Sequence, residues 1–192
     1  MITLTSEGAV ATDQNGGTLA TIDYFGRGVD AAATLTGLFG FEPVVEVVAP
    51  VATDFGFQGT LYDWEGFRLY WQYGYEDDPQ SGIGSRPFQP PTSFTSTVAA
   101  VRDVAIVATD GAAVGDGQGD LSALYPDQTR SYTDPNGVVV ESAFIDCLVL
   151  PPNGGGPDEP EGDPMNCVGL RAEPSDGAVT SIHAPAGLNY GM

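Results

Sequence analysis

The fold is decided by the segment TLATIDYFGRGVDAAATLTGLFG, residues 18–40, in which a strand pattern passes through a glycine turn into a helix pattern. Residues 18–25 alternate enough to predict a strand. Asp30 is placed to cap the helix, and Gly40 stands where a helix would end. The helix is predicted from apolar residues at helical spacing, namely Ala31, Leu35, Leu38 and Phe39. Such a short helix cannot bury its apolar face alone, so we expect it to pack on a sheet.

Strand patterns and turn signals occupy most of the remaining chain. The predicted strands cover residues 44–52, 59–75, 94–100, 104–109, 130–150, 167–173 and 178–185. Within 59–75, residues 63–66 (DWEG) predict a hairpin turn. A second, shorter helix is predicted over 121–125 and is ended by Pro126.

A weak internal repeat relates the two halves of the chain. Helix residues recur at a constant offset of 86, so that Asp30, Leu35, Leu38 and Phe39 correspond to Asp116, Leu121, Leu124 and Tyr125. We therefore predict an α+β fold of two tandem repeats, each a short helix packed on an antiparallel β-meander. The predicted division is a tether or loose strand over 1–17, a first repeat over 18–75, a Pro/Gly-rich connection over 76–92, and a second repeat over 93–192 that contains an acidic loop at 151–165.

Composition excludes several classes of function. The chain of 192 residues carries a formal net charge of −20, and all six of its basic residues are arginine. Such a charge repels a phosphate backbone, which excludes a generic nucleic-acid binder and argues against docking on anionic lipid. Without lysine, neither Schiff-base nor P-loop lysine chemistry is possible. The content of 26 glycines and 15 prolines excludes a bundle of long helices.

The two cysteines indicate the compartment. Cys147 and Cys167 flank the acidic loop, and each stands beside a strand-like run, so a hairpin would bring them face to face. We predict that they form a disulfide and that the protein is exported, either extracellular or anchored as a lipoprotein. Two unrelated buried thiols are the alternative. The first residues show no signal-peptide pattern, and no stretch is long and apolar enough for a transmembrane helix.

The arrangement of these motifs resembles a family of functionally unassigned secreted proteins and lipoproteins of GC-rich bacteria. The resemblance rests on residues 25–40, 62–69, 110–126 and 169–182. The helix-on-meander repeat is also similar in topology to the beta-lactamase inhibitor proteins and to small outer-membrane assembly lipoproteins. These resemblances imply an architecture of tandem repeats, and they supply no catalytic residue.

Acidic and glycine-rich segments offer weak cation sites. Asp116 and Asp120 lie in a glycine-rich turn. If Asp116 is the first residue of an EF-hand loop, the sixth is Leu121 where that loop needs glycine. The helix that follows is too short for a dinucleotide-binding fold. An irregular calcium site at Asp116 and Asp120, or in the acidic loop at 158–163, stays open. Solvated acidic loops are the favoured interpretation, and no other cofactor is expected.

Two arrangements of residues could serve catalysis. His183 is the only histidine, but no G-x-S-x-G motif accompanies it, so we expect a solvent-facing strand residue. Asp63 and Glu65 stand two apart, as paired carboxylates of a glycosidase could, but they lie at a hairpin tip. A hydrolase of the cell envelope that uses these acidic residues is therefore only an alternative.

The residues that follow this hairpin suggest recognition instead. Trp64, Arg68 and Tyr70 are candidates for an exposed aromatic strip that binds protein or sugar rings at the cell surface. The other interpretation is that Trp64 folds over the hairpin and closes the core. We expect a monomeric, non-enzymatic binding or structural module, with the hydrolase and a calcium-stabilised structural domain as alternatives.

Overall fold

The structure is a computed structural model. It describes residues 1–48, 59–72, 92–117, 121–133, 137–149, 165–173 and 177–188. These residues form an α+β fold in which strands predominate, as predicted. Within these ranges, no helix has the length and apolar character needed to cross a membrane.

Two helices and thirteen strands are described. They are β1 (Ile2–Leu4), β2 (Gly8–Thr12), β3 (Thr18–Asp23), α1 (Gly28–Phe39), β4 (Val44–Val48), β5 (Gly59–Trp64), β6 (Phe67–Gln72), β7 (Thr92–Ser96), β8 (Ala100–Val101), β9 (Val104–Ala108), α2 (Leu121–Leu124), β10 (Thr129–Thr133), β11 (Val139–Val149), β12 (Met165–Glu173) and β13 (Ala178–Leu188).

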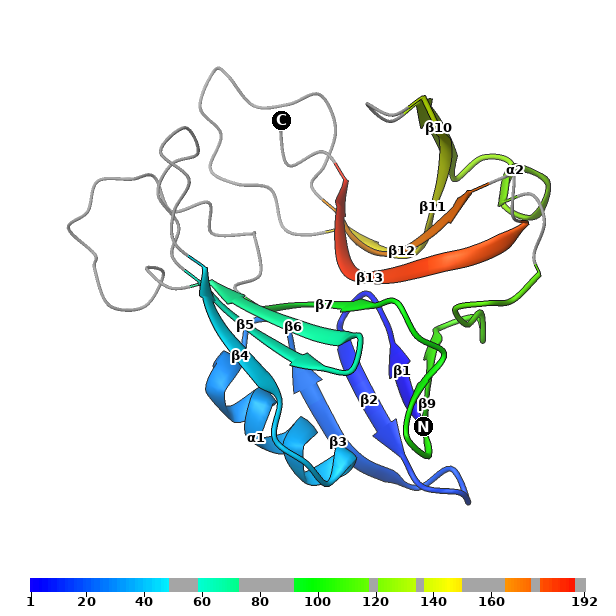
Figure 1. The fold of residues 1–192 in the computed structure, drawn as a ribbon. Helices are drawn as coiled ribbons and strands as arrows, with labels where there is room; N and C mark the ends of the chain where they lie inside the picture. Colours follow the sequence, from blue (N-terminus) through cyan, green and yellow to red (C-terminus); the bar gives the residue numbers. More distant parts are fainter. Residues whose placement is uncertain are drawn as a thin grey trace.

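The strands form two sheets that both halves of the chain share. The smaller sheet has the order β3-β2-β1-β9-β8, and β1 runs parallel to β9. The larger sheet has the order β10-β11-β12-β13-β7-β6-β5-β4, so that β7 joins the first-half hairpin β5–β6 to β13 (Figure 1). The tandem-repeat interpretation stays a prediction, because these pairings cross the proposed boundary.

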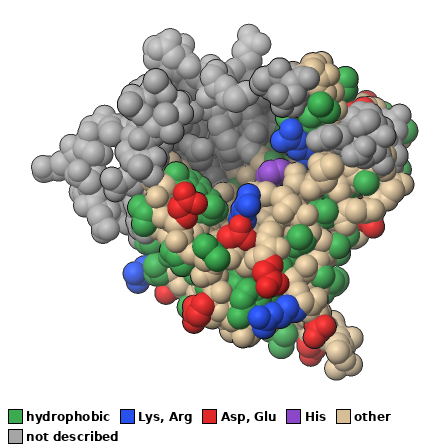
Figure 2. Space-filling view, in the orientation of Figure 1, with side chains coloured by type: hydrophobic (Ala, Val, Ile, Leu, Met, Phe, Trp, Pro, Cys, Tyr) green, Lys and Arg blue, Asp and Glu red, His purple; other side chains and the backbone are tan. Residues whose placement is uncertain are grey.

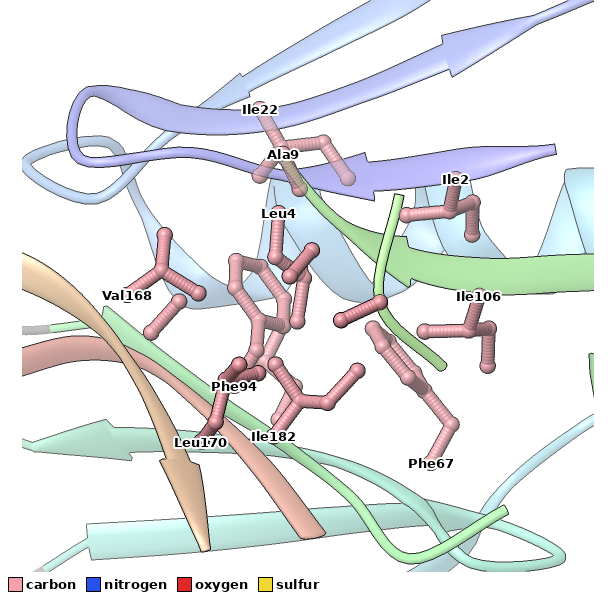
Figure 3. Packing of buried hydrophobic residues seen from close by; sticks show 14 of the residues in the cluster. Ile2, Leu4, Ala9, Ile22, Phe67, Phe94, Ile106, Val168, Leu170 and Ile182 are labelled. Atoms are coloured by element: carbon pink, nitrogen blue, oxygen red, sulfur yellow. The ribbon is translucent and has the colours of Figure 1, made fainter. Parts of the chain in front are cut away.

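One hydrophobic core lies between the two sheets. In Figure 3, Ile2 and Leu4 of the small sheet point toward Phe94, Leu170 and Ile182 of the large sheet. All five side chains are at most 1 % exposed. Helix α1 lies beside the small sheet and covers the face of β4–β6 that is turned toward the core (Figure 1). The helix therefore closes the core at that end.

Helix α1 ends where the sequence predicts and begins earlier. Gly40 has a φ of 75°, and its N–H donates to the carbonyl of Thr36. At the other end Arg27 occupies the N-cap position without a side-chain bond, so the expected Asp30 cap is wrong. Asp30 lies inside the first turn, where its negative charge favours the helix dipole. A β-carbon on Gly28 would lie 2.1 Å from Trp71, which is why the helix can begin against the sheet only at a glycine.

Of the two predictions for residues 1–17, the tether is wrong, and the strand is present but firmly held rather than loose. This segment contains β1, the central strand of the small sheet, and β2 beside it. Ile2 and Leu4 are 1 % and 0 % exposed, and Ala9 and Ala11 on β2 are also buried. Strand β1 has only three residues and the buried side chains of β2 are alanines, so neither strand gives a strong pattern. The place of β1 in the fold depends on its pairing with β9.

The predicted disulfide is confirmed. Cys147 and Cys167 are bonded with an S–S distance of 2.08 Å and link β11 to β12 across 20 residues of sequence. Asp146, next to this bond, accepts a hydrogen bond from the backbone N–H of Ser6 at 2.9 Å. The end of β11 is therefore fastened both to its neighbouring strand and to the N-terminal segment.

Candidate functional site

The β5–β6 hairpin separates the three residues predicted to form an exposed strip. Its register pairs Trp64 with Phe67 and Asp63 with Arg68. Directly paired side chains share a face and successive ones alternate, so Trp64 lies on the face opposite to Arg68 and Tyr70. Trp64 is fully buried beside Phe39, with ring centroids 5.8 Å apart. The expectation that Trp64 is exposed is therefore wrong, and the alternative, in which it closes the core, is correct.

Tyr70 combines a structural contact with partial exposure. Its ring lies against the backbone of Gly59 on β5, where a β-carbon would be 2.4 Å from the ring. Burial raises the pKa of the Tyr70 hydroxyl above its ordinary value. The ring thus covers a glycine of the neighbouring strand, which protects a weak point of the sheet.

We call the side of the large sheet that faces away from the core the outer face. Its central row crosses three strands, because Arg68 on β6 pairs with Thr95 on β7, and Thr95 pairs with His183 on β13. A second row runs through Ser181, Arg171, Ser142 and Arg130 on β13, β12, β11 and β10. Figure 2 shows His183, the only histidine, at the surface with arginine side chains on both sides of it.

His183 is held by hydroxyl groups at both ring nitrogens. Its Nδ1 lies 3.1 Å from Thr95 Oγ1, and its Nε2 lies 2.8 Å from Ser181 Oγ. Burial, together with the positive charge of Arg171, lowers the pKa of the imidazole. At neutral pH the ring is therefore uncharged, and it can donate one hydrogen bond and accept the other.

The arginines of the outer face are each oriented by a neighbour. The Nε of Arg68 lies 2.8 Å from Asp63 Oδ2. The guanidinium of Arg171 lies over the ring of Tyr132 at 5.9 Å, and that of Arg130 lies 5.8 Å from the ring centroid of Phe144. An arginine stacked on a ring keeps its N–H donors at its edge, which is the geometry that binds oxyanions in pairs of hydrogen bonds.

The Ser181–His183 contact also matches the distance between a nucleophile and its base. In a serine hydrolase, however, a carboxylate orients the histidine, and here Thr95 occupies that side of the ring. Ser181 lies within β13, which is paired with strands on both sides, so an oxyanion hole built from backbone N–H groups has no place there. The arrangement is better suited to binding than to acyl transfer.

The acidic pair of the alternative hydrolase is used in the hairpin turn. Asp63 Oδ1 accepts the N–H of Gly66, and Asp63 Oδ2 binds Arg68. Glu65 lies in the turn itself with a φ of 55°. These contacts explain the Asp63 carboxylate as part of the hairpin, and Glu65 stands at the hairpin tip.

The predicted cation site is only partly described. Asp116 Oδ2 accepts the N–H of Ala113 at 2.8 Å, which stabilises the loop before α2. Asp120 and the acidic loop at 158–163 lie outside the described residues. Among the residues that are described, no group of three or more histidine, cysteine or carboxylate side chains could hold a metal ion.

Sequence reasoning missed the partners of His183. The segment 180–183 (TSIH) alternates around Ile182, which is buried, and this alternation places Ser181 and His183 on the other face. Thr95 and Arg171 reach the same place only through the pairing of β7, β12 and β13, which no local pattern reveals.

Comparison with known proteins gives no further guidance, because no protein-family model, curated protein or solved structure matches this chain.

Proposed function

We propose that this protein is a non-enzymatic binding module whose ligand docks on the outer face around His183. The observation that carries the proposal is the gathering of Arg68, Arg130 and Arg171 on this one face. They are three of the five arginines in the described residues of a chain with a net charge of −20.

The polar side chains between these arginines support a recognition role. Thr95, Ser181 and His183 form a hydrogen-bonded group of fixed geometry. Ser181 is buried and Thr95 and His183 are half-buried, so their arrangement is fixed before a ligand binds, which keeps the cost in side-chain entropy small. Polar side chains that served only to keep the surface hydrated would not need to be bonded to one another in this way.

The compartment is proposed on separate grounds. The Cys147–Cys167 disulfide is compatible with an extracellular protein, because such bonds persist in oxidising compartments. We propose a location outside the cell or on its surface as a lipoprotein, in line with the resemblance to bacterial secreted proteins, and a protein or glycan of the cell surface as the partner.

The proposal is tested by blocking the outer face. Ser142 lies between Arg171 and Arg130 in the second row, so Ser142→Trp places a bulky ring there. Leu19→Trp is the matched control, because Leu19 is 61 % exposed on β3 of the other sheet. Wild type and both variants are applied to immobilised arrays of glycans and bacterial surface proteins. We expect a ligand that wild type and Leu19→Trp retain and Ser142→Trp loses; a ligand retained equally by all three would contradict the proposal.

A hydrolase is the second candidate, because Ser181 Oγ lies 2.8 Å from His183 Nε2. Turnover of p-nitrophenyl acetate by wild type and its loss in Ser181→Ala would favour it. Equal background rates in both proteins would leave the binding module as the function.

A further inference from the structure

We propose that the ligand of the outer face is an acidic saccharide, of which one anionic group is bound by Arg171 and another by Arg68, and whose hydroxyls are bound by the serine and threonine side chains between them. The inference rests on the proposed function and names its ligand class. It follows from three properties of the face, which are its local charge, its hydroxyl content and its fully paired backbone.

The local charge of the outer face is opposite to that of the whole protein. Among the described side chains of the large sheet that point to this face, three arginines stand against two carboxylates, those of Asp63 and Glu46. At physiological ionic strength the Debye length is about 8 Å, so charges elsewhere on the surface act only weakly here. An anion at Arg171 therefore experiences mainly the guanidinium group of Arg171 itself and, more weakly, that of Arg130 two strands away.

The space between the arginines is lined by neutral groups that both donate and accept hydrogen bonds. Ser93 and Thr95 on β7, Ser181 and His183 on β13, and Ser142 on β11 share the outer face. Adjacent strands are about 5 Å apart, so Thr95 and His183 span the distance between Arg68 and Arg171. The hydroxyl groups of Ser93, Thr95 and Ser142 match the hydroxyls of a sugar, which also donate and accept, while His183 and the buried Ser181 hold Thr95 in place.

The backbone of this face favours a saccharide over a peptide. Strands β6, β7, β13 and β12 are each paired on both sides, so an extended peptide cannot join them by strand addition. The rings of Tyr132 and Phe144 already lie near Arg171 and Arg130, which leaves recognition to charged and hydroxyl groups. An acidic peptide would have to bind by its carboxylates alone.

The test compares four probes by isothermal titration calorimetry. They are a tetragalacturonate, a sulfated chondroitin tetrasaccharide, the neutral cellotetraose and a hexaglutamate peptide. The first two probes show whether the anionic group that binds is a carboxylate or a sulfate. The variants are Arg171→Gln and Arg68→Gln, with Arg102→Gln as the control. Arg102 lies in the β8–β9 turn of the small sheet and stacks over Phe41 at 3.8 Å, so its substitution changes the net charge equally at another site.

We expect an acidic saccharide to bind wild type and Arg102→Gln alike, and Arg171→Gln to weaken binding by roughly ten- to hundredfold. Equal weakening by Arg102→Gln would show a nonspecific charge effect and overturn the inference, as would the failure of both acidic saccharides to bind. If cellotetraose or hexaglutamate binds and Ser142→Trp abolishes that binding, the inference of an acidic saccharide is overturned. The proposed function of the outer face would still stand. Unchanged binding of every probe to Ser142→Trp would instead overturn the proposed function.

Discussion

Leu35 is the most deeply buried hydrophobic side chain of helix α1. Its side chain is 0 % exposed, whereas Leu38, one turn further along the helix, is only partly buried. Leu35→Ala should lower the free energy of unfolding by about 2–5 kcal/mol, because it leaves a cavity between the helix and the sheet. Urea denaturation monitored by tryptophan fluorescence measures this loss.

Leu38→Ala is the internal comparison for Leu35→Ala. It removes the same atoms from the same helix at a position that solvent partly reaches, so its effect should be smaller. Equal losses for the two variants would mean that the helix does not dock through Leu35.

The half-buried His183 of the outer face makes stability depend on pH. Burial and Arg171 hold the pKa of His183 below its ordinary value, so the unfolded chain takes up the proton more readily than the folded protein does. The stabilisation is complete above the unfolded pKa of about 6.5 and is lost as the pH falls below that value. The free energy of unfolding should therefore decrease between pH 7.5 and 5.5 in wild type.

His183→Asn separates this effect from the carboxylates, most of which titrate at lower pH. The variant should show a flatter dependence over the same range, and Arg171→Gln an intermediate one, because it removes only one of the two causes. Identical curves for wild type and His183→Asn would contradict the assignment.

At the scale of an element, the β5–β6 hairpin contains a strained position. Glu65 and Gly66 connect the strands with φ values of 55° and 104°, and both fall in the left-handed region. Such a two-residue turn favours Asn-Gly, and a left-handed conformation costs an ordinary residue about 1 kcal/mol or more. Glu65→Asn should therefore raise the free energy of unfolding by about 1 kcal/mol, measured by urea denaturation.

Gly66→Ala provides the opposite case in the same turn. A β-carbon there would meet Val98 at 2.9 Å in addition to the unfavourable φ, so this variant should be destabilised. If Glu65→Asn proved neutral or destabilising, the turn geometry would not limit the stability of the hairpin.

Elements with a strong local signal were predictable from the sequence. The spacing of Leu35 and Phe39 followed by Gly40 predicted α1, and the DWEG segment predicted the hairpin turn. Short strands such as β1 were not predictable, because three residues give no periodicity and their burial depends on a partner more than a hundred residues away. Trp64 was uncertain for a similar reason. Alternation defines two faces, but it does not say which face the helix covers.

At the scale of the whole molecule, the disulfide fastens the end of the large sheet. Cys147–Cys167 closes a loop of 20 residues, and such a constraint is worth about 3 kcal/mol in the chain-entropy model. The double variant with both cysteines changed to serine should lose about this much free energy of unfolding, measured by urea denaturation. Two freely alkylated thiols in the native wild-type protein, detected by intact mass, would contradict the bond itself.

The candidate site also belongs to this scale, which explains why the sequence revealed so little of it. Arg68 and Thr95 come from opposite sides of the segment between β6 and β7, and His183 comes from near the end of the chain. The sheet order alone brings them into one row. A single sequence contains the residues but not the long-range pairing that makes them neighbours.

The large net charge should make the whole fold sensitive to salt. A net charge of −20 on a chain of 20.0 kDa produces repulsion that the compact state feels more strongly than the expanded unfolded chain. Added salt shortens the Debye length and weakens this repulsion. The melting temperature should therefore rise between 10 and 300 mM sodium chloride, by about 2–4 °C for each kcal/mol of relief, as followed by circular dichroism.

Calcium distinguishes general screening from a bound ion. At matched ionic strength, calcium, magnesium and sodium chloride should give similar melting temperatures if screening alone acts, because Asp116 is already engaged by the N–H of Ala113. A further rise that calcium alone produces would require a specific site and would favour the calcium-stabilised alternative. A melting temperature that falls as sodium chloride is added would show that charge repulsion is not what opposes folding, since screening can only weaken the interactions among these carboxylates.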